Sequence, residues 1–196
     1  MAPMRLSHGF HDADRPAVAA LYWEAFGQKL GRALGPEPKA LRFIEAVLSP
    51  DHAVCAWDEG GRLLGVAGFK TRDGALVGGQ LRDMTRIYGH PGALWRLALL
   101  ALLSRDTENA RFLMDGLFVA PHARGQGVGT RLLEAIAEEA RTRGYREVRL
   151  DVVEENLRAR ALYERLGYRP VACHSTGLLR YVFRFRAATT MVLEVG

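Results

Sequence analysis

The sequence predicts an α/β (α+β) fold in which helices flank a mixed central sheet. Residues 113–119 form an apolar run that Pro121 ends, as expected of a buried strand, because proline has no N–H to give to a sheet. From Val128 to Ala140 apolar residues recur with helical spacing, and residues 147–153 form a second apolar run. This strand–helix–strand order favours two parallel strands joined by a crossover.

The N-terminal segment predicts a short strand at residues 4–10 followed by a helix. Asp12 or Asp14 is expected to cap this helix, whose apolar face runs to Phe26. Residues 27–38 are rich in glycine and proline and are predicted to be a connection.

A second helical stripe at residues 41–48 precedes two β-leaning runs at residues 52–57 and 62–70. The loop at residues 58–61 ends in two glycines, which favour a hairpin. We therefore expect the two runs to form an antiparallel pair.

The C-terminal part predicts a helix at residues 157–166, ended by Gly167, and closing strands at residues 168–174 and 187–195. Residues 180–186 alternate in a strand-like way, and either extend the last strand or form a loop.

Three glycines stand on alternate positions between the strand at 113–119 and the next helix, in the run Arg124, Gly125, Gln126, Gly127, Val128, Gly129 and Thr130. Bare backbone N–H groups at a helix N-terminus bind phosphate well, although glycines also occur in such turns for geometry alone. No lysine follows as in an ATP-binding loop, and the spacing misses the dinucleotide fingerprint by one residue. A nucleotide-binding oxidoreductase is therefore the less favoured alternative.

This run, preceded by Leu117 to Pro121, resembles the Q/R-x-x-G-x-G/A signature of the GNAT superfamily of N-acetyltransferases. Residues 149–153, Asn156 and residues 161–168 resemble the next strand and helix of that family. The resemblance covers residues 113–171 and implies a mostly antiparallel sheet with 113–119 parallel to 147–153.

Residues 71–110 depart from the family pattern, which has a short connection between its third and fourth strands. Within this insert, residues 94–103 form a helix that is apolar nearly all round and must be covered. We consider three roles for it: an extra core helix, a homodimer contact and a lid over the acceptor.

The resemblance also implies roles for particular residues, with acetyl-CoA as the cosubstrate and a primary amine attacking directly in a ternary complex. The backbone of Leu117, Phe118 and Val119 would lie along the pantetheine arm, and Asn156 would bind the pantetheine amides. Residues 124–130 would surround the pyrophosphate. Tyr163 would protonate the leaving thiolate, or else is a core tyrosine.

Two carboxylates are candidates for the base that takes the proton of the amine. Asp115 and Asp151 each lie inside an otherwise apolar strand, where a carboxylate is costly unless it is hydrogen-bonded or used. Either of them can instead be a structural carboxylate.

Composition favours one globular domain spanning residues 1–196, with 48% apolar and 25% charged residues. The net charge of +5 comes from scattered arginines, so no nucleic acid is expected. The histidines show no metal spacing, and Cys55 and Cys173 are expected to pack in the core. Without a membrane-spanning or leader-like segment, a cytoplasmic location is expected. The acceptor, a small-molecule or peptide amine, is not identified, and a non-catalytic acyl-CoA-binding module is the main alternative function.

Overall fold

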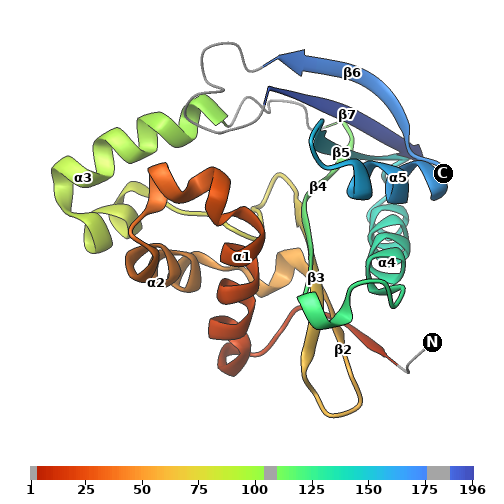
Figure 1. Cartoon of the computed structure of the whole chain (residues 1–196), viewed down its shortest axis with the longest axis horizontal. Helices are drawn as coiled ribbons and strands as arrows, with labels where there is room; N and C mark the ends of the chain where they lie inside the picture. Colours follow the sequence, from red (N-terminus) through yellow and green to blue (C-terminus); the bar gives the residue numbers. More distant parts are fainter. Residues whose placement is uncertain (1–3, 104–109, 176–185) are drawn as a thin grey trace.

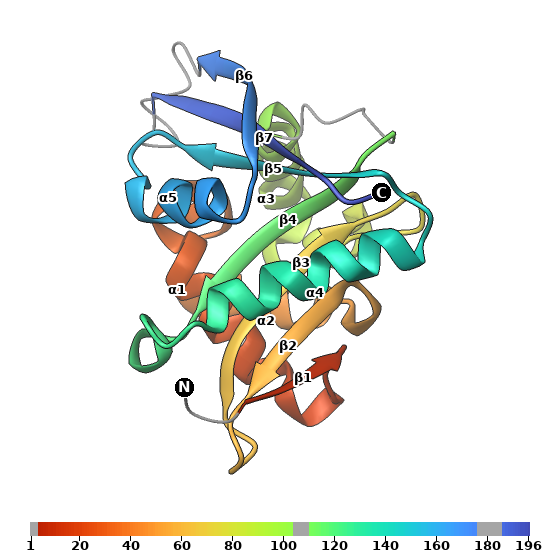
Figure 2. The same ribbon diagram turned by 90° about the vertical axis from the view of Figure 1, so that its right-hand side faces the viewer.

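A computed structural model describes residues 4–103, 110–175 and 186–196. In these ranges seven strands form one mixed sheet with the order β1-β2-β3-β4-β5-β7-β6 (Figures 1 and 2). The strands are β1 (Arg5–His8), β2 (Ala53–Trp57), β3 (Leu63–Lys70), β4 (Phe112–Val119), β5 (Glu147–Val153), β6 (Arg169–Ser175) and β7 (Ala187–Glu194).

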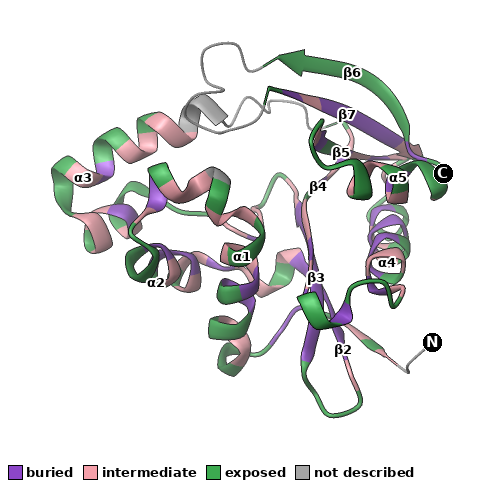
Figure 3. Cartoon of the chain, viewed as in Figure 1, coloured by how far each residue is buried: buried purple, intermediate pink, exposed green. Residues whose placement is uncertain are grey.

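Helices cover both faces of this sheet. One face carries α1 (Arg15–Leu34) and α2 (Glu37–Val47), and the opposite face carries α4 (Val128–Thr142), as Figure 1 shows. Beyond α1 and α2 lies α3 (Leu81–Leu103), and α5 (Leu157–Arg165) follows β5. Because β3 lies between the two layers, its residues from Leu63 to Phe69 are all buried (Figure 3).

The predicted strand pairings are confirmed. β2 and β3 are antiparallel, and β4 and β5 are parallel. The parallel ladder in the described structure consists of Phe112 opposite Val148 and Leu113 opposite Arg149, after which the two strands diverge. The sheet therefore opens between the C-terminal ends of β4 and β5.

The crossover helix α4 has the buried face that its spacing predicts. Its buried residues are Val128, Leu132, Leu133, Ile136, Ala137 and Ala140. Gly144 follows with φ of 78°, as expected for a residue that ends a helix.

The predicted end of α1 was wrong. The helix continues through Gly27 and Gly31 to Leu34, where we expected a connection. Ala33 and Leu34 are buried, so tertiary packing outweighs the weak helix propensity of the two glycines. The expected cap is also corrected: Asp14 occupies the N-cap position, but its carboxylate accepts the His11 N–H and does not cap α1.

The insert contains α3, which bends at Gly89, where φ is 72° and ψ is 168°. Ala93 is fully buried, and the Tyr88 hydroxyl donates to the Leu34 carbonyl of α1. On the other side, Leu94 is 63% exposed and Trp95 is 47% exposed. Leu97, Leu99 and Leu100 are partly buried against the core, so this helix packs on one side, and the roles of extra core helix, dimer contact and lid all stay predictions.

The cysteine prediction holds for one residue and fails for the other. Cys55 is fully buried in β2, and burial raises the pKa of its thiol to about 12. Cys173 is exposed because β6 is an edge strand whose seven residues are all exposed. The alternating segment at residues 180–186 lies outside the described residues, except for Arg186.

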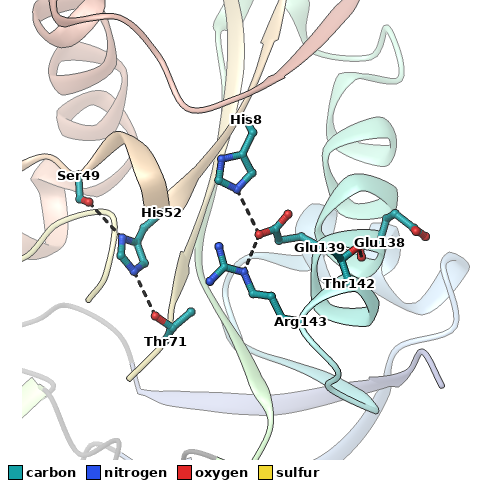
Figure 4. A network of polar contacts seen from close by, with 8 residues as sticks. All are labelled: His8, Ser49, His52, Thr71, Glu138, Glu139, Thr142 and Arg143. Atoms are coloured by element: carbon teal, nitrogen blue, oxygen red, sulfur yellow. Dashed lines mark hydrogen bonds and ion pairs between the residues drawn. The ribbon is translucent and has the colours of Figure 1, made fainter. Parts of the chain in front are cut away.

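A polar cluster connects α4 to the edge strand β1 (Figure 4). The Glu139 carboxylate of α4 accepts a hydrogen bond from the Arg143 Nε at 2.6 Å and lies 3.1 Å from the His8 Nε2 of β1. Partial burial acts to raise the pKa of Glu139, but the hydrogen bonds from Arg143 and His8 hold it below its usual value. His8 is therefore a structural partner of α4.

A second histidine in the same view connects two loops (Figure 4). His52 Nδ1 lies 3.0 Å from the Ser49 Oγ and its Nε2 lies 3.1 Å from the Thr71 Oγ1. Burial and, after it, the positive charge of Arg143 lower the pKa of His52. His52 thus also has a packing role.

Candidate active site

A pocket of about 780 Å³ lies between α1, the end of β4, the glycine loop and α5. It brings together eleven of the predicted site residues: Leu117, Phe118, Val119, Arg124, Gly125, Gly127, Val128, Gly129, Thr130, Asn156 and Tyr163. Asp115, Gln126 and Asp151 are predicted site residues that do not line it. The eleven predicted residues that line the pocket are thus up to 46 positions apart in the chain, from Leu117 to Tyr163.

The glycine loop has the geometry of an anion cradle. Gly125 and Gly127 have φ of 80° and 84°, a left-handed conformation that favours glycine. Gly127 is the N-cap residue of α4, so the N–H groups of the first turn have no partner within the helix. A Cβ on Gly129 would lie 3.1 Å from the Leu162 Cδ2 of α5. These features fit a pyrophosphate bound at the positive end of α4.

The end of β4 presents backbone groups to the pocket. The Ala120 N–H donates to the Leu64 carbonyl at 2.8 Å, on the β3 side. Because N–H groups alternate along a strand, the N–H of Val119 points the other way, toward the gap beyond the last β4–β5 pair. Val119 can therefore donate to a ligand in that gap.

Two side chains of the loop are held by local contacts. Arg124 donates from Nε to the Val119 carbonyl at 3.2 Å, and its Nη2 lies 3.3 Å from the Glu24 Oε1 of α1. Gln126 donates to the His122 carbonyl at 2.8 Å, within its own loop. Arg124 thus connects the cradle to α1, whereas Gln126 supports the turn.

Asn156 caps α5, with its Oδ1 accepting the Ala159 N–H at 3.2 Å. Capping fixes the side chain and uses its oxygen. A ligand in the pocket would therefore meet the two amide N–H donors of Asn156.

Tyr163 lies at the pocket with only 6% of its surface exposed. Its ring centre is 5.8 Å from that of Tyr168. Burial raises the pKa of Tyr163 to about 12. At neutral pH its hydroxyl therefore carries a proton that it can donate.

Asp151 is held by neighbours in the sheet. Its Oδ1 accepts the Thr190 hydroxyl at 2.5 Å, and its Oδ2 lies 3.3 Å from the Arg149 Nη2. Thr190 is also its register partner on β7. This carboxylate has structural partners, and a role for it as base stays a prediction.

Asp115 occupies an irregularity of β4, because Gly116 and Met114 pair with consecutive residues of β3 and Asp115 is left between them. Such bulges re-aim a side chain and are common beside active sites. Burial and then the charge of Asp115 raise the pKa of Tyr22, whose ring lies 5.7 Å from that of Phe118 on the pocket wall. The charge of Asp115 therefore acts close to the pocket.

The sequence did not point to four charged residues that line the pocket, namely Glu24, Glu155, Arg158 and Arg165. Glu155 accepts the backbone N–H of Arg186 at 3.1 Å. Arg158, Leu162 and Arg165 are spaced to lie on one face of α5. This spacing is a signal that would have found the two arginines.

The structure shows neither a metal cluster nor a membrane helix where it describes the chain. Its described residues contain no group of three or more His, Cys, Asp or Glu side chains placed to hold a metal ion. Within the same ranges no helix is long and apolar enough to cross a bilayer.

The fold and the cradle together place the protein among acetyltransferase folds. YncA from Salmonella typhimurium, described as a putative acetyltransferase with its cofactor acetyl-CoA, aligns with a TM-score of 0.62 and 20% identity over 100% of this chain and 95% of that one. An N-acetyltransferase from Staphylococcus aureus Mu50 aligns with a TM-score of 0.66 and 13% identity over 96% of this chain and 100% of that one. The chain belongs to the acetyltransferase (GNAT) family, whose model matches residues 15–168.

Curated relatives match a shorter part of the chain. Mycothiol acetyltransferase of Beutenbergia cavernae is 48% identical over 84 residues, 43% of this chain and 27% of the relative. Thialysine N-epsilon-acetyltransferase of Bos taurus is 39% identical over 54 residues, 28% of this chain and 32% of the relative. The matches thus span less than half the length of these relatives.

Proposed function

We propose that the protein is an N-acyltransferase that moves an acetyl group from acetyl-CoA to a primary amine by direct attack in a ternary complex. The observation that carries this proposal is the pocket in which the glycine cradle, the Val119 N–H and the buried Tyr163 face one space. Thioester aminolysis needs a phosphate anchor, an oxyanion donor and a proton donor for the thiolate, and these groups can supply all three.

Each of these residues would contact a different part of the cosubstrate. The first N–H groups of α4 hold the pyrophosphate, and the Asn156 amide donates to the pantetheine arm. The Val119 N–H stabilises the negative charge that forms on the carbonyl oxygen when the amine attacks.

Two proton transfers complete the reaction. The amine nitrogen forms a bond to the acetyl carbon and loses a proton through water to Asp115 or Asp151, since neither carboxylate lines the pocket. As the carbon–sulfur bond breaks, Tyr163 gives its proton to the thiolate, so that the products are an amide and CoA with a free thiol. Tyr163 then regains a proton from solvent, and the protonated carboxylate releases its proton to solvent.

The acceptor is a small-molecule or peptide amine, and the names of the relatives do not agree on one. They include a mycothiol, a thialysine and a streptothricin acetyltransferase. A panel of amines assayed by thiol release would identify the acceptor class. A cytoplasmic location also stays a prediction.

Replacing Tyr163 by phenylalanine tests the proposed chemistry. Tyr163→Phe should lower kcat about tenfold to a thousandfold with little change in CoA affinity, because the hydroxyl acts mainly in the transition state. Tyr168→Phe is the matched control, since Tyr168 is a buried ring neighbour that does not line the pocket. Its hydroxyl has no hydrogen-bond partner in the described structure, so its removal should not lower stability.

The same assays separate the other functions. Tight CoA binding without thiol release for any amine would favour a non-catalytic acyl-CoA-binding module over an enzyme. A melting temperature raised by NADH but not by CoA would instead favour the dinucleotide alternative. Full turnover in Tyr163→Phe would make Tyr163 a packing residue.

A further inference from the structure

The charged side chains that line the pocket differ in whether they already have a partner. Arg124 is paired with Glu24 at 3.3 Å, and Glu155 accepts the backbone N–H of Arg186 at 3.1 Å. Arg158 and Arg165 also line the pocket, and across the described ranges of the chain neither has an ion-pair or hydrogen-bond partner. The pocket therefore contains two arginines whose charges are available to a ligand.

These two arginines lie on the face of α5 that is turned toward the cradle. They are seven residues apart, two helical turns or about 10 Å along the axis. Leu162 lies between them on the same face and approaches the site of a Gly129 Cβ to 3.1 Å. Since Gly129 belongs to the first turn of α4, Arg158 and Arg165 flank the place where that turn meets α5.

A third arginine of α5 shows the contrast. Arg160 pairs with Glu164 at 2.9 Å and does not line the pocket. It has the same side-chain chemistry on the same short helix, but its charge already forms an ion pair with Glu164. Arg160 is therefore a matched control for the other two.

The proposed cosubstrate has more negative charge than the cradle can bind. Coenzyme A carries a pyrophosphate and, separately, a phosphate on the 3′-hydroxyl of its ribose. The α4 N-terminus takes the pyrophosphate, which leaves the 3′-phosphate to be matched elsewhere. Guanidinium groups bind phosphate oxygens through paired hydrogen bonds, more specifically than a point charge does.

We propose that Arg158 and Arg165 bind the 3′-phosphate of coenzyme A and so set a preference for coenzyme A over its 3′-dephospho form. This inference rests on the proposed function, because it requires the pyrophosphate to occupy the cradle. It assigns the wall formed by α5 a recognition role that is separate from the chemistry at Tyr163.

Calorimetric titration of the full chain with CoA and with 3′-dephospho-CoA tests the proposal. The wild type should bind CoA about tenfold or more tightly than the dephospho form, as expected for charge-assisted hydrogen bonds at an exposed site. In Arg158→Gln/Arg165→Gln the preference should fall to about twofold or less, with the affinity for 3′-dephospho-CoA nearly unchanged. Arg160→Gln should keep the wild-type preference, and added salt should weaken that preference.

Three outcomes would overturn the assignment. Equal wild-type affinities for the two ligands would show that the 3′-phosphate is not recognised. An equal loss for both ligands in the double variant would place the arginines on the pyrophosphate. If Arg160→Gln lost as much of the preference for CoA as the double variant, the preference would come from the overall positive charge of α5 and not from Arg158 and Arg165. Absence of CoA binding by the wild type would, in contrast, remove the proposed function itself.

Discussion

Two helices of this protein, α4 and the more apolar α3, pack differently. Six of the seven apolar residues of α4 fall on one face and are buried against the sheet (Figure 3). In α3 the apolar residues occur on all sides, and Leu94 and Trp95 remain exposed. A glycine with positive φ is associated with each helix: Gly127 directly precedes α4, and Gly89 lies inside α3.

The difference shows that apolar content alone does not orient a helix. In α4 the spacing specifies which side packs, and the glycine at its start leaves backbone donors for a ligand. In α3 the side that packs depends on particular contacts, such as Tyr88 with the Leu34 carbonyl. We therefore expect changes in α4 to affect stability and binding more than equivalent changes in α3.

The largest effect is expected for Gly127→Glu compared with Gly89→Glu. Both variants put a side chain at a left-handed residue, at a cost of about 1–3 kcal/mol in stability. Only Gly127→Glu puts a negative charge at the cradle, so its Kd for CoA should rise about a thousandfold, the equivalent of several kcal/mol. Calorimetry measures both variants. Equal CoA affinities for the two would show that the ligand does not sit at the start of α4.

Ile136→Ala and Leu94→Ala compare the packing of the two helices. Ile136 is fully buried, so its truncation should lower the free energy of unfolding by about 2–5 kcal/mol. Leu94 is 63% exposed, and its truncation should change that free energy by about 0.5 kcal/mol or less. Urea titration gives both values. A loss above about 2 kcal/mol for Leu94→Ala would show that α3 is covered in solution.

Alkaline pH should affect stability through Tyr163 more than through Tyr88. Burial raises the pKa of Tyr163 to about 12, and it also raises that of Tyr88, against the opposing charge of Arg96. The folded state thus holds the phenol proton more tightly than the unfolded state, whose pKa is 10.0. The stabilisation is complete below pH 10 and is lost as pH rises toward 12.

Between pH 9 and pH 11 the wild type should therefore lose about 1 kcal/mol more of its unfolding free energy than Tyr163→Phe does. The corresponding difference for Tyr88→Phe should be smaller. Urea titrations at the two pH values measure both. Identical pH dependence of the wild type and Tyr163→Phe would contradict the burial of that hydroxyl in solution.

The smallest effect on stability is expected for Leu94→Glu/Trp95→Glu. Both side chains are exposed, so the unfolding free energy should change by about 0.5 kcal/mol or less. Light scattering on the same samples tests the predicted homodimer. A dimer formed through α3 would be halved in mass by this variant, and equal masses of the two proteins would exclude that contact.

How far the sequence predicts the structure differs between these regions. The face of α4, the left-handed glycines and the parallel strand pair follow from local spacing and from proline and glycine geometry. The length of α1 does not, because Gly27 and Gly31 weaken a helix only until packing of Ala33 and Leu34 outweighs them. Local propensity therefore predicts element types better than element ends.

The sequence predicts the backbone parts of the candidate site better than its side-chain pairs. Its backbone parts lie in one short run around Gly127, so a single stretch of sequence reveals them. The partner of Asp151 is Thr190, 39 positions away, and Glu24 meets Arg124 from 100 positions away. Such pairings depend on the completed fold, and no local pattern indicates them.

The short ladder between β4 and β5 also bears on how the protein opens. Among the residues that the structure describes, two residue pairs connect these strands, whereas the antiparallel ladders on either side are longer. The sheet thus consists of two well-paired parts, β1–β4 and β5–β7, which few hydrogen bonds join. Amide hydrogen exchange should begin at the β4–β5 boundary. A ligand that hydrogen-bonds to both strands in the gap would replace the absent β4–β5 hydrogen bonds and join the two parts into one cooperative unit.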